Sequence, residues 1–233
     1  MNIIGIDSSG LVAGVAIYSD GKIIAEYSTN FKKTHSQTLL PMLNEIKMMT
    51  GFDLAEADAI AISSGPGSYT GLRIGSATAK GIAFVIDKPI VEVPTLEGLA
   101  YNLWGVGDLI CPLKDARRKQ VYTGLYEFNP ELNTVLEGCA ESLDLLIEKI
   151  NETERPVIFL GDGVPVYKDY LEENIKVPYR FAPAHKAYQS AASIATLGAI
   201  YYQKGKTVNA DDHAPTYLRK SQAENEGPKK FEV

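Results

Sequence analysis

The first hydrophobic runs of the chain are short and are interrupted by small polar residues, a pattern typical of β-strands. Residues 2–7, 12–18 and 22–28 are rich in isoleucine, valine and tyrosine, and Ser19-Asp20-Gly21 separates the second run from the third. An Asp-Gly pair between two such runs is a hairpin signal. We therefore expect three strands in succession, the last two joined by a tight turn.

After these strands the pattern changes to an alternation of helices and strands. Over residues 34–49 the apolar residues Leu39, Leu43, Ile46 and Met49 recur every three or four positions, which predicts a helix. The remaining elements of this half are a buried strand, a second helix, a strand and a third helix, expected at 58–63, 70–86, 90–94 and 95–103.

The second half of the chain repeats this plan. Asp115 ends an apolar strand as Asp7 does, and a glycine pair followed by a tyrosine occurs in both halves, at Gly65, Gly67 and Tyr69 and at Gly161, Gly163 and Tyr167. A long apolar helix is expected over 189–205. The repetition predicts a duplicated α/β fold of two lobes, each with a mixed sheet flanked by helices. We place an N-terminal lobe at 1–104, a C-terminal lobe at 105–220 and a polar tail at 221–233.

Composition narrows the class of protein. Among 233 residues 45% are hydrophobic and 22% are charged, values typical of a globular protein. The net charge of −6 disfavours tight binding of nucleic acid by the whole surface. Cys111 and Cys139 are too few for a disulfide framework, and the N-terminus has no basic segment before its apolar run. These features predict a cytoplasmic protein.

The predicted second helix carries a row of small residues. Gly71, Gly75, Ala79 and Ala83 recur every four positions, so this side of the helix has no bulky side chain. Small residues in such a row let another helix approach closely. Glycine inside a helix costs about 1 kcal/mol relative to alanine, so close packing must offset it. The partner is either the helix at 34–49 or a helix of another subunit.

Three segments are candidates for nucleotide binding. A carboxylate at a strand end can hold Mg²⁺, and glycines before a helix can admit phosphate. The residues are Asp7, Ser8 and Ser9 after the first strand, Gly65 and Gly67 in the glycine-rich loop, and Gly161, Asp162 and Gly163 in the second half. Simple tight turns explain the same residues. The glycine-rich loop also lacks the lysine of a Walker A motif.

Arg117, Arg118 and Lys119 place three cations on the turn after Asp115. Such a run is either a solvated turn or a local contact for RNA phosphate or an acidic partner. The histidines are His35, His185 and His213, and no HxxxH or HExxH pair suggests a metal site.

Five segments of the chain resemble one family. They are Ile6-Asp7-Ser8-Ser9, residues 34–41 (THSQTLLP), residues 65–75 (GPGSYTGLRIG), Asp115-Ala116-Arg117-Arg118 and residues 215–219 (PTYLR). In this order they resemble the bacterial TsaB family, also called YeaZ. The resemblance implies a duplicated actin-like ATPase (ASKHA, ribonuclease H-like) fold.

The resemblance also implies a function. Members of this family work with a catalytic subunit, TsaD, and an ATPase, TsaE, to transfer a threonylcarbamoyl group to the adenosine beside the anticodon of tRNAs that read ANN codons. A member is then a non-catalytic scaffold, a homodimer when alone, that contacts tRNA only through the complex. No cofactor of its own is implied, and ATP or ADP with Mg²⁺ is expected, if anywhere, at the assembled interface.

The family's first-lobe helices, which form homodimers and bind TsaD, map onto the two helices predicted here. The expected interface residues are His35, Leu39, Leu43, Ile46, Gly71, Leu72, Gly75, Ala79 and Ala83. The metal-binding HxxxH of the catalytic relative has no counterpart, because Leu39 follows His35 at the fourth position. The competing hypothesis is an enzyme of the actin-like superfamily, either kinase-like or metallopeptidase-like.

Overall fold

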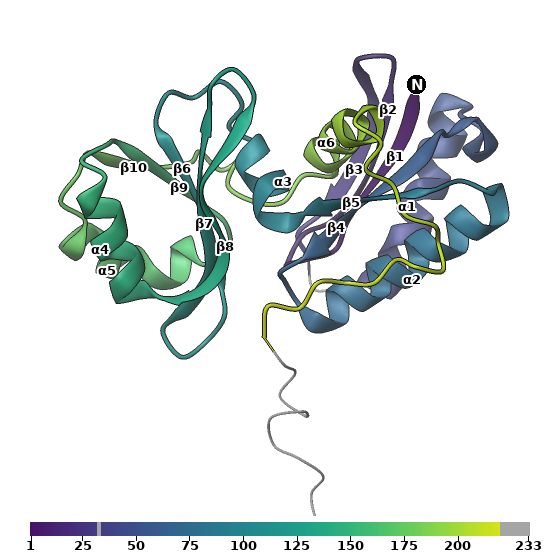
Figure 1. Ribbon diagram of the computed structural model, residues 1–233. Coiled ribbons are helices and arrows are strands. Elements are labelled where there is room, and N and C mark those ends of the chain that lie inside the picture. Colours follow the sequence, from purple (N-terminus) through teal and green to yellow (C-terminus); the bar gives the residue numbers. More distant parts are fainter. Residues whose placement is uncertain (32–33, 220–233) are drawn as a thin grey trace, which may run out of the picture.

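The computed structural model describes residues 1–31 and 34–219, which form two lobes (Figure 1). The first lobe is built on a five-stranded mixed sheet of order β3-β2-β1-β4-β5. Its strands are β1 (Asn2–Asp7), β2 (Ala13–Ser19), β3 (Lys22–Thr29), β4 (Ala59–Gly65) and β5 (Ile90–Pro94). The pairs β1–β2 and β2–β3 are antiparallel, and β1–β4 and β4–β5 are parallel.

The second lobe repeats this topology. Its strands are β6 (Leu109–Asp115), β7 (Gln120–Phe128), β8 (Leu132–Ser142), β9 (Val157–Leu160) and β10 (Tyr179–Phe181). The order β10-β9-β6-β7-β8 is that of the first sheet read from the other edge, and the antiparallel and parallel pairs correspond. The predicted duplication is confirmed.

Within the described residues, six α-helices flank the sheets. They are α1 (His35–Thr50), α2 (Tyr69–Ile86), α3 (Thr95–Tyr101), α4 (Leu143–Glu152), α5 (Val164–Asn174) and α6 (Ala191–Gln203), with a 3₁₀ turn, η1, at Leu54–Glu56. Helices α1 and α2 bury their apolar sides on one face of the first sheet, and α4 and α5 do so on the second. None of these helices is long and apolar enough to cross a membrane.

The two remaining helices do not keep to the half of the chain in which they occur. Helix α6, near the end of the chain, covers the other face of the first sheet, where Ile194 and Leu197 pack against Ile3 and Val91. Helix α3 follows the first sheet in sequence, but its Leu96 packs in one cluster with residues of the second sheet. The predicted division at residues 1–104 and 105–220 is therefore wrong, because an all-apolar helix pattern does not specify which sheet the helix covers.

Residues 207–219 form an extended segment, the C-terminal strap, along the first lobe. Val208 pairs with Ile90 at the edge of β5, and the N–H of Thr216 donates to the carbonyl of Ser64 at 2.7 Å. The guanidinium of Arg219 then donates to the carbonyl of Ala116 in the second lobe at 3.0 Å. The strap thus joins the lobes, and the expected tail at 221–233 lies outside the described residues.

Candidate functional site

The row of small residues on α2 faces the interior of its own lobe. Gly71, Gly75, Ala79 and Ala83 are all buried. A methyl group at Gly71 would lie 2.1 Å from the carbonyl oxygen of Ser8, and one at Gly75 would lie 2.2 Å from the hydroxyl of the same serine. The glycines therefore let α2 approach the loop after β1, which offsets their low helix propensity.

The prediction that this row faces a partner is wrong. Leu39, Leu43 and Ile46 of α1 and Ala79 and Ala83 of α2 belong to one buried cluster with the first sheet. Leu72 is also buried, and the Nε2–H of half-buried His35 donates to the carbonyl of Gly10 at 2.8 Å. All nine residues expected at the interface serve the lobe itself, because the sheet and the β1 loop need the same small, apolar sides of both helices.

The opposite sides of these helices carry exposed apolar residues. On α2, Phe84 and Val85 are 77% and 82% exposed, and on α1 Met48 is 73% exposed. Ala77 and Gly81 lie on the same side of α2, and nothing lies within 4 Å of a methyl group placed on Gly81. We call Leu40, Met48, Ala77, Gly81, Phe84 and Val85 the outer helical face. Ala77 and Gly81 are also four positions apart, so α2 carries a second pair of small residues at the spacing of the first row.

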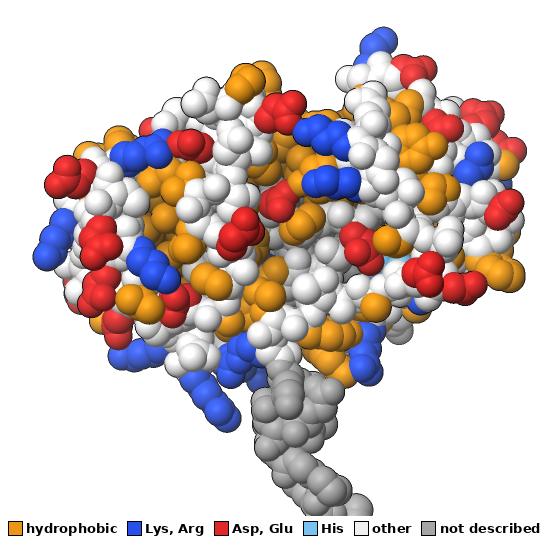
Figure 2. Space-filling model, viewed as in Figure 1, with side chains coloured by type: hydrophobic (Ala, Val, Ile, Leu, Met, Phe, Trp, Pro, Cys, Tyr) orange, Lys and Arg blue, Asp and Glu red, His pale blue; other side chains and the backbone are white. Residues whose placement is uncertain are grey.

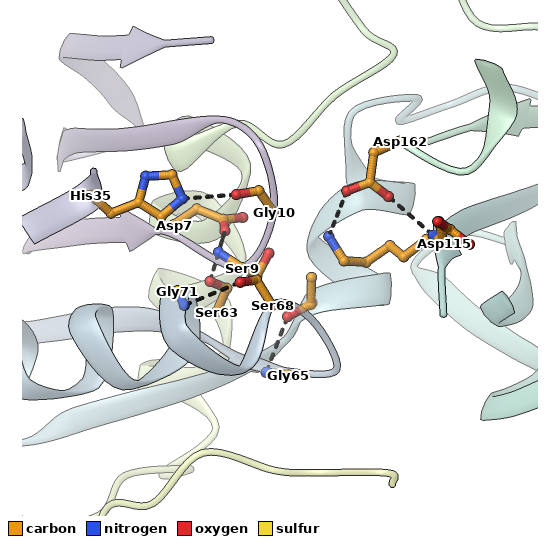
Figure 3. A network of polar contacts seen from close by, with 12 residues as sticks. Asp7, Ser9, Gly10, His35, Ser63, Gly65, Ser68, Gly71, Asp115 and Asp162 are labelled. Atoms are coloured by element: carbon orange, nitrogen blue, oxygen red, sulfur yellow. Dashed lines mark hydrogen bonds and ion pairs between the residues drawn. The ribbon is translucent and has the colours of Figure 1, made fainter. Parts of the chain in front are cut away.

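The predicted nucleotide residues do meet where the lobes face each other (Figure 3). Asp7 lies at the end of β1, and its Oδ1 accepts hydrogen bonds from the N–H of Ser9 and the hydroxyl of Ser63, each at 2.8 Å. Burial raises the pKa of the Asp7 carboxyl above its usual range, although the Ser9 N–H and the charge of Lys114 act in the opposite direction. This carboxyl is enclosed by protein.

The glycine loops beside Asp7 are filled by the chain's own backbone. Methyl groups at Gly65 and Gly67 would lie 2.2 Å and 2.3 Å from the carbonyl oxygens of Thr216 and Ser9. The N–H of Ser68 also donates to the carbonyl of Ser9, and the hydroxyl of Ser68 caps the N–H of Gly71. The N–H groups of Ser68 and Gly71 at the start of α2 are therefore bonded to the protein itself and are not free for a phosphate.

The corresponding loop of the second lobe is similar. Gly161 and Gly163 both approach the carbonyl of Leu113, and a methyl group at Gly161 would lie 2.2 Å from that oxygen. Asp162 pairs with Lys114, whose ammonium lies 3.5 Å away. The side chain of Lys114 is buried, and its Nζ would lie 2.8 Å from a methyl group at Gly10 of the first lobe.

The junction therefore does not fit a magnesium nucleotide. A cation of the protein itself, Lys114, lies where the two lobes bring Asp7 and Asp162 toward each other. Among residues 1–31 and 34–219, no group of three or more histidine, cysteine, aspartate or glutamate side chains could hold a metal ion. Lys114 gave no signal in the sequence, because a lysine at the end of a strand is usually exposed.

The basic turn after β6 has an unusual backbone. Arg117, Arg118 and Lys119 have φ angles of 64°, 56° and 56°, a region that non-glycine residues rarely occupy. The carboxylate of Asp115 accepts the Arg117 N–H at 2.8 Å, and the carbonyl of Lys119 accepts the N–H of Leu143 at 3.2 Å. All three basic side chains are exposed.

The sequence matches the family model described as TsaD, tRNA N6-adenosine threonylcarbamoyltransferase, over residues 22–226. It is also 35% identical over 230 residues to the tRNA threonylcarbamoyladenosine biosynthesis protein TsaB of Bacillus subtilis (strain 168), with 96% of each chain covered. The chain belongs to the TsaB family. The resemblance inferred from the five sequence segments is confirmed.

Solved structures of TsaB-like and more distant proteins show the same fold. YeaZ from Pseudomonas aeruginosa superimposes with a TM-score of 0.77 at 24% identity, covering 93% of this chain and 99% of that one. The activator of the 2-hydroxyisocaproyl-CoA dehydratase from Clostridium difficile, solved with bound ADPNP, gives a TM-score of 0.51 at 12% identity over 88% of this chain and 97% of that chain. The chain has the duplicated actin-like ATPase fold.

Proposed function

We propose that this chain is the non-catalytic partner subunit of a complex that transfers a threonylcarbamoyl group to the adenosine beside the anticodon of tRNAs that read ANN codons. Its role is to hold a TsaD catalytic subunit in the active form. Membership of the TsaB family supports this role, since the relative from Bacillus subtilis is named for tRNA threonylcarbamoyladenosine biosynthesis. A cytoplasmic location follows from a tRNA substrate.

The single observation that carries the proposal is the outer helical face. Large exposed apolar residues gathered on one side of a protein mark interaction surfaces. Phe84, Val85 and Met48 supply apolar area, and Ala77 and Gly81 leave the α2 backbone open to a close neighbour. We assign this face to a pair of TsaD helices, and in the free state to a second copy of this chain.

A catalytic role for the chain itself has little support. The side chain of His35 donates to a backbone carbonyl, and Leu39, at the position of a second metal ligand, is buried in the core. The likeness to an ADPNP-bound protein concerns the fold. We assign ATP or ADP and Mg²⁺ to the assembled interface with TsaD, where the TsaE ATPase would also act, and not to the junction holding Lys114.

Gly81→Leu tests the docking assignment. Leucine favours a helix more than glycine does by about 0.8 kcal/mol, so the variant should fold at least as well as the wild type. The new side chain would project where a partner helix must approach, and we expect binding to TsaD, measured by calorimetry, to weaken by at least about tenfold, or 1.4 kcal/mol.

Gly107→Leu is the matched control, because Gly107 is also exposed and open but lies in the segment between α3 and β6. It should bind TsaD like the wild type. Equal binding by both variants would remove the outer helical face from the interface, even if a complex still forms.

A further inference from the structure

Cations from three separate segments meet beside the point where the strap reaches the second lobe. Arg117, Arg118 and Lys119 lie on the turn after β6, Arg73 lies in the first turns of α2, and Arg219 ends the strap. We call these five residues the basic junction surface. Figure 2 shows lysine and arginine side chains along the lower edge of the molecule in that view.

Hydrogen bonds and ring contacts hold these segments next to each other. The guanidinium of Arg219 donates to the carbonyl of Ala116, the residue before the basic turn, at 3.0 Å. Tyr217 is two residues earlier, and its ring lies 4.9 Å from that of Tyr69 at the start of α2. Arg73 stacks 4.1 Å above Tyr69 and donates to the hydroxyl of Tyr217 at 3.3 Å. The cations therefore belong to one surface that spans both lobes.

The cations of the turn are held outward and are not neutralised. Within the part of the chain that the structure describes, Arg117 and Arg118 take part in no ion pair or side-chain hydrogen bond, and Lys119 only approaches the ring of Tyr170, at 5.6 Å. The carboxylate of Asp115, at the start of the turn, accepts hydrogen bonds from the N–H of Arg117 and the hydroxyl of Tyr167. In a protein of net charge −6, three neighbouring cations on one turn, at Arg117, Arg118 and Lys119, point to an anionic partner.

We propose that the basic junction surface binds the phosphate backbone of the substrate tRNA while the chain is held in the complex. This proposal rests on the proposed function. Arginine forks match phosphate oxygens in two-point hydrogen bonds, and closely spaced cations suit a polyanion better than a single acidic side chain. Contacts with phosphate supply position and affinity without depending on the base sequence.

The surface also explains the conformation of the basic turn. Three successive residues in the left-handed region keep the turn tight while their side chains leave in the direction of solvent. The strap, tied to both lobes, adds Arg219 to the same side. A net acidic chain thereby presents one local site for RNA and repels it elsewhere.

The test is the affinity of an unmodified transcript of a tRNA that reads an ANN codon, measured by fluorescence anisotropy. The variant is the full chain with Arg117→Gln, Arg118→Gln and Lys119→Gln, in complex with TsaD. The matched control removes three exposed lysines elsewhere, with Lys22→Gln, Lys168→Gln and Lys176→Gln, and changes the net charge equally. We expect the turn variant to bind the tRNA at least about tenfold more weakly than the wild type. The slope of log affinity against log salt concentration should fall by the equivalent of roughly two to three phosphate contacts. The control should stay within about twofold of the wild type.

Equal tRNA affinities of the turn variant, the control and the wild type would overturn the proposal. If tRNA affinity is unchanged but the turn variant binds TsaD more weakly, the surface recognises an acidic protein segment and the RNA assignment is wrong. Parallel titrations of the isolated chain at low salt make the same comparison without TsaD. The isolated chain could lose tRNA affinity in the turn variant and yet form no complex with TsaD. That result would contradict the proposed function and still support tRNA binding by the basic junction surface.

Discussion

At the scale of single residues, the lobe junction is built around a buried lysine. Lys114 pairs with Asp162 in its own lobe and reaches Gly10 of the other, and Asp7 contributes a buried carboxyl. The position of Asp7 at a strand end could be predicted from the sequence. Its burial and the role of Lys114 could not, because both depend on how closely two separate lobes approach.

The carboxyl of Asp7 gives a prediction for the pH dependence of stability. Its folded-state pKa is raised, so the folded protein holds this proton more firmly than the unfolded chain does. The free energy of unfolding therefore falls as the pH rises from the usual carboxyl pKa through the folded value. Asp7→Asn keeps an oxygen for Ser9 and Ser63 but does not titrate. Its free energy of unfolding in urea, relative to that of the wild type, should therefore be higher at pH 8 than at pH 5.

Asp7→Ala is the contrasting variant. It leaves the N–H of Ser9 and the hydroxyl of Ser63 without their acceptor, and the free energy of unfolding should drop by about 1–3 kcal/mol at both pH values. If Asp7→Asn proves as unstable at pH 8 as Asp7→Ala, the junction needs the negative charge itself.

At the scale of elements, α2 has two small-residue rows that serve different purposes. The first row receives the loop after β1, and the second, at Ala77 and Gly81, lies open. Spacing predicted the helix and the need for a close neighbour. It could not predict which row faces the sheet, because both rows consist of glycine and alanine and the deciding contact, Ser8, comes from a distant loop.

Two alanine substitutions separate these rows by their effect on stability. Gly71→Ala places a methyl group against the backbone carbonyl of Ser8 and should lower the free energy of unfolding by about 1–3 kcal/mol. Gly81→Ala meets nothing and should raise it by about 0.5–1 kcal/mol, the difference in helix propensity. Chemical denaturation of both variants checks the pair, and equal effects would mean that α2 is rotated from the orientation described.

At the scale of the whole molecule, helices α3 and α6 and the strap connect the two lobes. The repeated order of strands and helices predicted the duplicated fold, and the comparisons confirm it. The positions of α3 and α6 could not be predicted, since an apolar helix such as residues 191–203 fits either sheet equally well. The result is one molecule that carries the outer helical face on one lobe and the basic junction surface across both.

The proposed function requires this chain for catalysis by the TsaD subunit. The direct measurement is the amount of threonylcarbamoyladenosine formed in an ANN-reading tRNA by TsaD and TsaE from the same organism, without the chain, with the wild type and with Gly81→Leu. We predict modification with the wild type, at least about tenfold less with Gly81→Leu, and none without the chain. Equal modification in the absence of the chain would contradict the account.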